Sequence, residues 1–186
     1  MRWPVLVVLL LLSESSSHRF EDYPLRGSPY HGTPSAPDLG SARFAHYYRT
    51  ALRDGAALGP SFAGEWAVVI WGCGTGCQYG AMVNSRTGRV CWLPQEMSRR
   101  AEFRLDSRLL VLSPVRPGDD IGPYPAEDPF VWYFEWTGTQ FRLVDSTWAV
   151  EAAGRTVTDS TPLPPDRPHT WQPCLWRAST PPPSLP

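Results

Sequence analysis

Lysine is absent from this chain of 186 residues, and all seventeen of its basic side chains are arginine. This absence excludes chemistry that depends on a lysine amine, such as a Schiff base, a Ser-Lys dyad or a Walker-A phosphate loop. Asparagine occurs once, at Asn84, and isoleucine twice, at Ile70 and Ile121. This skewed usage indicates a GC-rich genome and favours a bacterial source.

The chain also lacks an excess of charge of either sign. Seventeen basic against eighteen acidic residues give a formal net charge of -1 at pH 7, and charged residues make up 19% of the sequence. A protein that binds nucleic acid or an anionic membrane surface through charge needs a clustered positive excess. The composition argues against both of these partners, so we expect no nucleic-acid binding.

Long apolar runs are missing, apart from one short stretch near the N-terminus. Arg2 supplies a positive charge ahead of eight apolar residues at 5–12, and the small residues Ser15 and Ser17 suit a cleavage site. Eight helical residues rise about 12 Å, far less than the ~30 Å of a hydrocarbon core. Segment 1–17 is therefore predicted to be a cleaved signal peptide. We expect a periplasmic or secreted protein with no integral membrane span.

The chain has four cysteines, Cys73, Cys77, Cys91 and Cys174, and the predicted compartment determines whether they are expected to form disulfides or to bind a metal. In an oxidising environment an even number of cysteines is more often a disulfide framework than a metal site. Cys73 and Cys77 flank a Gly-Thr-Gly turn and would face each other across a hairpin, which leaves Cys91 to pair with Cys174. Four cysteines allow three pairings, and we expect this one. A metal site built from all four cysteines is less favoured, so no metal ion and no cofactor are expected.

The sequence after the signal peptide divides into three parts. A single disulfide-stabilised, β-rich domain is predicted at 41–176. The leader at 18–40 is rich in proline, glycine and serine without periodicity, which predicts an extended leader or linker. The tail at 177–186 is rich in proline, which is too stiff and too poor in hydrogen-bond donors to join a sheet.

The spacing of apolar residues changes along the chain, and this change separates one predicted helix from a series of predicted strands. The helix is predicted at 42–53, with Ser41 as its N-cap, Gly55 at its end and an apolar face that includes Phe44, Tyr47 and Tyr48. From residue 62 the period is two, which predicts strands at 65–71, 78–83, 89–93, 109–112, 131–136 and 140–144. An antiparallel sheet needs a cover on one face. We expect an α+β, β-rich fold, an antiparallel meander of about five or six strands with one N-terminal amphipathic helix packed on it.

Four segments carry a resemblance to a known family: Phe62-Ala63-Gly64-Glu65-Trp66, Trp71-Gly72-Cys73-Gly74-Thr75-Gly76-Cys77-Gln78, Phe103-Arg104-Leu105-Asp106-Ser107-Arg108-Leu109-Leu110 and Tyr133-Phe134-Glu135-Trp136. Over roughly residues 43–145 the chain resembles a family of small exported bacterial proteins that carry a Trp-Gly-Cys-Gly-Thr-Gly-Cys element. That family has no established activity. The resemblance implies export and a bacterial source, and it supplies no catalytic residues.

Candidate catalytic groups are few, and no residue is predicted to be catalytic. Glu65, Asp106 and Glu135 lie in or beside predicted strands, where two of them could form the carboxylate pair of a glycosidase. A hydrolase that acts on envelope material through these residues is therefore one alternative function. Thiol redox chemistry by Cys73 and Cys77 is a less favoured alternative, since thiol oxidoreductases normally use a Cys-x-x-Cys motif.

Aromatic residues exceed ordinary usage, with nine tryptophans in the chain. Large rings on an exposed face suit recognition of a protein or a glycan, whereas the competing interpretation places most of them in the core. The candidate ligand-binding residues are Trp132, Trp136, Tyr133 and Trp71. We expect an exported, disulfide-stapled, non-enzymatic binding or envelope-associated protein, with an envelope protein or a cell-wall glycan as its partner.

Overall fold

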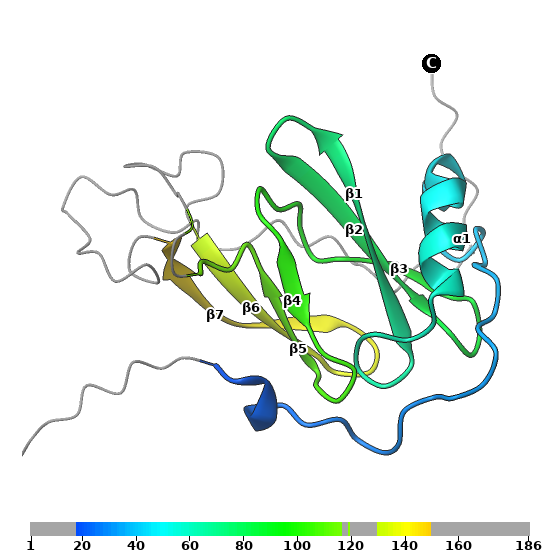
Figure 1. Ribbon diagram of the computed structural model, residues 1–186, viewed down its shortest axis with the longest axis horizontal. Coiled ribbons are helices and arrows are strands. Elements are labelled where there is room, and N and C mark those ends of the chain that lie inside the picture. The colour runs from blue at the N-terminus through cyan, green and yellow to red at the C-terminus, as the bar shows by residue number, and fades with distance from the viewer. Residues whose placement is uncertain (1–17, 117–118, 120–129, 150–186) are drawn as a thin grey trace, which may run out of the picture.

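In the part of the chain that the structure describes, the fold contains two antiparallel sheets and one α-helix, shown in Figure 1 for this computed structural model. The structure describes residues 18–116, 119 and 130–149. The first sheet has the strand order β1-β2-β3, and the second has the order β4-β5-β6-β7. The prediction of a β-rich antiparallel fold is confirmed, but the strands form two sheets and not one continuous meander.

Six of the seven described strands overlap the predicted strand segments, and the exception is the short strand at 101–103. The first sheet consists of β1 (Trp66–Gly74), β2 (Cys77–Asn84) and β3 (Val90–Trp92). The second consists of β4 (Ala101–Phe103), β5 (Leu109–Leu112), β6 (Phe130–Trp136) and β7 (Phe141–Trp148). The helical segments precede both sheets: the 3-10 helices η1 (Phe20–Asp22) and η2 (Ala45–Tyr48), and the α-helix α1 (Arg49–Ala57).

The chain leaves the first sheet shortly after β3. Pro94 cannot donate to a strand ladder. The residues around it nevertheless stay beside β2, because the Leu93 N–H donates to the Gly80 carbonyl at 2.9 Å and Met97 exchanges two backbone hydrogen bonds with Gln78. The next strand, β4, pairs with β5 and starts the second sheet. Alternation along each strand cannot reveal this break, because it specifies faces and not strand neighbours.

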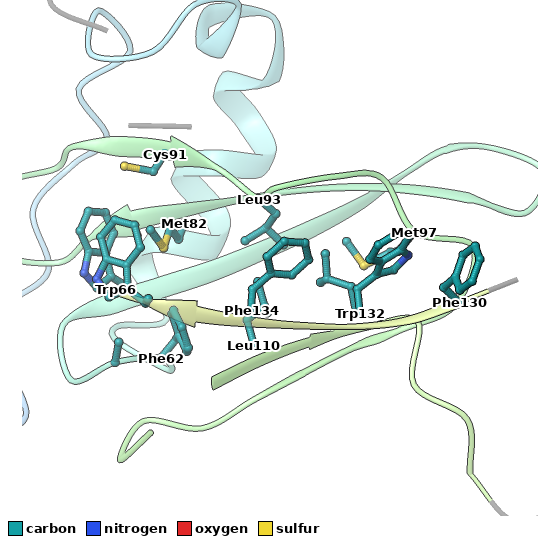
Figure 2. Close-up of a cluster of buried hydrophobic side chains, with 13 residues drawn as sticks. Phe62, Trp66, Met82, Cys91, Leu93, Met97, Leu110, Phe130, Trp132 and Phe134 are labelled. Atoms are coloured by element: carbon teal, nitrogen blue, oxygen red, sulfur yellow. The ribbon is translucent and has the colours of Figure 1, made fainter. Parts of the chain in front are cut away.

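The main hydrophobic core lies between the two sheets, where Figure 2 shows side chains pointing toward one another from both. Trp66 and Met82 enter it from the first sheet, and Leu110, Trp132 and Phe134 enter it from the second. Each of these side chains is buried. Full burial of one such side chain contributes about 1.5–3 kcal/mol, so this cluster accounts for much of the stability of the fold.

The opposite face of the first sheet contacts α1. Val69 of β1 and Ala81 of β2 alternate with the core-facing residues and share a second hydrophobic cluster with Leu52 and Ala56 of α1. In Figure 1, α1 lies on the side of the first sheet that faces away from β4–β7. The first sheet therefore buries apolar side chains on both of its faces.

The helical region begins later than predicted. Phe44 has φ 66° and ψ 0°, a left-handed conformation that interrupts any helix starting at 42, so η2 begins only at Ala45. Ser41 does not cap a helix. Its hydroxyl oxygen instead accepts a hydrogen bond from the Val90 N–H of β3 at 2.9 Å, which ties this segment to the first sheet.

Gly55 lies inside α1 and does not end it. A Cβ atom at this position would lie 2.5 Å from a methyl carbon of Val69, so the glycine allows α1 to approach β1 closely. The helix ends at Ala57, and Gly59 with φ +83° takes the left-handed position that follows its C-cap.

The segment at 18–40, predicted as an extended leader, is hydrogen-bonded to the loops of both sheets. The Leu25 N–H donates to the Asp106 carbonyl, and the Ser35 N–H donates to the Ser85 carbonyl, each at 2.8 Å. These contacts hold the segment along the body of the protein, as Figure 1 shows.

The predicted signal peptide at 1–17 and the Pro-rich tail at 177–186 lie outside the described residues. Both assignments stay predictions. Within the described part of the chain, no helix has the length and apolar character needed to cross a membrane.

We expect Gly55→Ala to destabilise the protein by about 1–3 kcal/mol, because the added methyl group overlaps Val69. At an exposed helix position the same change stabilises by about 1 kcal/mol. Urea unfolding of Gly55→Ala, Val69→Ala and the double variant measures the effect, and the double variant should lose most of the Gly55→Ala penalty. Thr50→Ala, at an exposed position of the same helix, is the matched control. A stabilised Gly55→Ala variant would contradict the close approach.

Candidate functional site

A cavity of about 270 Å³ lies beside β2 and β3, where η2 meets the first sheet. Its lining, called the aromatic pocket below, consists of Phe44, Tyr47, Tyr48, Tyr79, Gly80, Trp92, Leu93, Gln95 and Glu96. Five large hydrophobic side chains are exposed in the described part of the chain, and three of them, Phe44, Tyr47 and Tyr79, line this pocket. Exposed apolar side chains are therefore concentrated at one place on the surface.

The register of the first sheet brings three large rings to the same face. Trp71 of β1 pairs with Tyr79 of β2, and Trp92 of β3 pairs with Ala81, two residues along β2 from Tyr79. Tyr48 of η2 packs against two of these rings, with its centroid 4.8 Å from that of Trp71 and 5.5 Å from that of Trp92. The pocket therefore lies over a packed group of aromatic rings.

A hydrogen bond from its indole N–H holds the Trp92 side chain in place. Its indole Nε1–H donates to the backbone carbonyl of Arg43 at 3.0 Å, which fixes both the ring and the residue before Phe44. Because this N–H is already hydrogen-bonded, Trp92 can contact a ligand only through the apolar part of its ring. The guanidinium carbon of Arg43 lies 4.5 Å from the centroid of the Phe44 ring, a cation–π contact at the rim.

Phe44 combines an unfavourable backbone with an exposed ring. Its left-handed conformation costs an L-residue about 1–2 kcal/mol, and its side chain is 42% exposed. Backbone strain of this kind collects at binding sites, where it places a side chain that the ligand needs.

The Cys73–Cys77 disulfide stands next to the polar wall of the pocket. The two Cα atoms are 5.2 Å apart, which confirms the predicted pairing across the hairpin turn. Oε2 of Glu96 lies 3.5 Å from Sγ of Cys77, and paired backbone hydrogen bonds between Gln78 and Met97 hold the two segments together. The three side chains form a cluster of possible metal ligands, but the two sulfurs are bonded to each other and neither is a thiolate.

Cys91 of β3 is fully buried in the core between the sheets. Its predicted partner, Cys174, lies outside the described residues, so the Cys91–Cys174 disulfide stays a prediction. The alternative of thiol redox chemistry by Cys73 and Cys77 also stays a prediction.

The four predicted ligand-binding residues lie in different parts of the fold. Trp132 and Trp136 are 6% and 3% exposed, because both rings project from β6 into the core between the two sheets. Both rings are structural and cannot meet a ligand at the surface. Tyr133 is half-buried, with its ring 5.0 Å from that of His18, and burial raises the pKa of its hydroxyl. Trp71 does not line the aromatic pocket, but its ring packs against that of Tyr48, which does, with the two centroids 4.8 Å apart.

Most residues of the pocket were not identified as site residues from the sequence. Phe44 and Tyr47 are expected on the buried face of a helix, but the left-handed turn at Phe44 leaves both rings exposed. Tyr79 and Trp92 join them only through strand pairing. The one signal that the sequence offers is the concentration of three aromatic residues within 44–48.

The three candidate catalytic carboxylates are each engaged by arginine, and none of them lines the aromatic pocket. Glu65 pairs with Arg86, Asp106 with Arg104, and Glu135 with both Arg142 and Arg108. The last of these groups is buried, whereas the other two lie at the surface.

The ion pairs of Asp106 and Glu135 have the wrong electrostatic effect for a general acid. Hydrogen bonding from Arg104 holds the pKa of Asp106 below its usual range. Hydrogen bonding from Arg142, with a further contribution from Arg108, lowers the pKa of Glu135. A glycosidase acid needs a raised pKa so that it keeps its proton near neutral pH. The geometry therefore gives no support to the hydrolase alternative.

The lowered pKa of Glu135 predicts a pH-dependent contribution to stability. The ionised carboxylate is stabilised by Arg142 and Arg108, so its contribution is fully present above about pH 4.3, the ordinary glutamate value. It is lost as the pH falls through the lower pKa of the folded state. We expect Glu135→Gln to reduce the free energy of unfolding at pH 7 by about 2 kcal/mol, and this difference should shrink at acidic pH.

Chemical unfolding of both proteins between pH 7 and pH 2.5 measures this difference. Asp54→Asn is the matched control, since Asp54 is exposed on α1 and forms no ion pair with a described residue. A difference between wild type and Glu135→Gln that stays constant over this range would contradict the assigned ion pairs.

Comparison with family models, with curated proteins and with solved structures yields no match to this chain. No relative therefore supplies a site or an activity.

Proposed function

We propose that this protein is an exported, non-enzymatic binding protein that takes its ligand in the aromatic pocket. The observation that carries the proposal is the exposed aromatic lining, with Tyr47 69% exposed beside Phe44 and the half-buried Trp92. Aromatic rings concentrate binding energy when a ligand covers them. Small-ligand sites are typically lined by apolar and aromatic side chains with a few polar groups, which describes this pocket.

The volume of the pocket limits what can enter it. About 270 Å³ lies near the lower end of the range for ligand sites, so one sugar ring, one side chain or one head group would fill it. An envelope protein or a cell-wall glycan can present a group of this size while the rest of the partner stays outside. This supports a recognition module that binds one projecting group.

Two further observations favour binding over catalysis in an oxidising compartment. Glu96 is the single titratable carboxylate among the lining residues, whereas acid–base hydrolysis of a glycan uses a pair. The Cys73–Cys77 disulfide lies on an exposed hairpin, where it would persist only outside a reducing cytoplasm. It therefore supports export.

The proposal is tested by titrating the ¹⁵N-labelled protein with soluble peptidoglycan fragments and following amide shifts. We expect the largest shifts at Tyr79, Gly80 and Leu93, and a loss of affinity of about tenfold in the Phe44→Gly variant, a size typical of a binding-site aromatic. Glycine relieves the left-handed strain at position 44, so this variant should unfold with an unchanged or higher free energy. Loss of binding without loss of stability identifies Phe44 as a ligand contact.

Leu58→Ala is the matched control, because Leu58 is 88% exposed and does not line the pocket. This variant should bind the fragments like the wild type. The proposal fails if neither peptidoglycan fragments nor small cationic or aromatic probes shift the pocket amides. It also fails if Phe44→Gly binds normally.

A further inference from the structure

We infer that the aromatic pocket binds a quaternary ammonium group. The inference rests on the proposed binding function and names the class of ligand. It follows from three properties of the lining: the orientation of its rings, the state of its one carboxylate, and its mostly apolar surface.

The rings present π faces in different directions. The ring planes of Tyr48 and Trp92 are inclined by 79°, with their centroids 5.5 Å apart, and Tyr47 and Tyr79 add two further rings to the lining. A cation is attracted to a ring face when it lies within about 6 Å of the centroid, and tryptophan attracts it most strongly. A group seated in this pocket can therefore approach more than one ring at once.

Glu96 makes the pocket acidic. It is the only lining residue with a formal charge, and its side chain is exposed. The other glutamates of the described residues are all neutralised by arginine, in the ion pairs of Glu21, Glu65, Glu102 and Glu135. Glu96 forms no ion pair with any described residue, so its charge is available to a cationic ligand.

The hydrogen-bonding capacity of the lining distinguishes between kinds of cation. A primary ammonium carries three N–H donors, each of which needs an acceptor, and a guanidinium carries five. Apart from Gln95 and Glu96, the polar side-chain groups of this lining are tyrosine hydroxyls and the indole N–H of Trp92, which already donates to Arg43. A quaternary ammonium has no N–H, and its methyl groups carry positive charge directly against the rings.

Arg43 lies at the rim, and its charge opposes a second cation. Its guanidinium carbon is 4.5 Å from the Phe44 centroid, so one face of that ring already holds a cation. The rings of Tyr47, Tyr48, Tyr79 and Trp92 have no cation–π contact with a described arginine. We therefore place the ligand against these four rings, with Glu96 in the same lining. The Tyr47 ring also contacts His46, with centroids 4.0 Å apart, so the ligand approaches it from the side of the pocket.

The direct test compares choline with 3,3-dimethyl-1-butanol, in which carbon replaces the charged nitrogen without a change of shape. Both are titrated into the full-length ¹⁵N-labelled protein at constant ionic strength, with ethanolamine as the primary ammonium. We expect choline to shift the amides of Tyr79, Gly80 and Leu93 and to bind about 5- to 30-fold more tightly than the neutral compound. Ethanolamine should bind more weakly than choline.

Two variants test whether the charge of Glu96 and the ring of Tyr47 contribute to choline binding. Glu96→Gln should weaken choline binding by about two- to fivefold, as expected for a partly exposed charge. Tyr47→Leu keeps an apolar side chain but removes one ring, and it should cost a similar factor. Both residues are exposed, so neither change disturbs the core, and Leu58→Ala should leave the affinity unchanged.

The inference is overturned if choline fails to bind, if the neutral compound binds equally well, or if ethanolamine binds more tightly. Unchanged affinity in both Glu96→Gln and Tyr47→Leu would also overturn it. If peptidoglycan fragments shift the same amides and choline does not, the pocket does not bind a quaternary ammonium group. The proposed binding function would still hold. If no probe reaches the pocket, the proposed function fails as well.

Discussion

The structure depends on a three-stranded sheet that is apolar on both faces and is unequally covered. The second sheet packs against one face of this sheet, and the side chains between them form the main core. The nine residues of α1 rise about 13 Å, whereas the nine residues of β1 span about 30 Å. The helix therefore covers only part of the other face. Toward the hairpin that carries the disulfide, the cover consists of aromatic side chains, and the pocket lies there.

Several contacts connect the lining of the pocket to the rest of the fold. The close approach at Gly55 fixes α1 against β1, and so fixes η2, which precedes it directly. Trp92 holds the backbone at Arg43, and the Cys73–Cys77 hairpin holds the segment with Glu96. These contacts give the rings defined positions before a ligand arrives, which lowers the entropic cost of binding.

Local sequence patterns predicted the local parts of this fold. Sequence patterns located six of the seven described strands but not β4, and the Gly-Thr-Gly spacing located the Cys73–Cys77 pairing, because both kinds of pattern depend on neighbouring residues. The break between the two sheets depends on which strands pair at long range, and alternation carries no such information. The interpretation of Gly55 was wrong for a similar reason, since its neighbour Val69 belongs to another element. The same limitation explains why abundant aromatic residues were recognised but could not be divided between core and surface.

Trp66, Trp132 and Trp136 lie in the core, whereas Trp92 lines the pocket and is partly exposed. The most direct test is ¹⁹F NMR of the protein labelled with 5-fluorotryptophan, with each signal assigned by a single Trp→Phe replacement. The change in shift between H₂O and D₂O reports the solvent contact of each ring. The account predicts a clear change for Trp92 and almost none for Trp66, Trp132 and Trp136. A solvent response at Trp132 or Trp136, with Trp92 shielded, would contradict it.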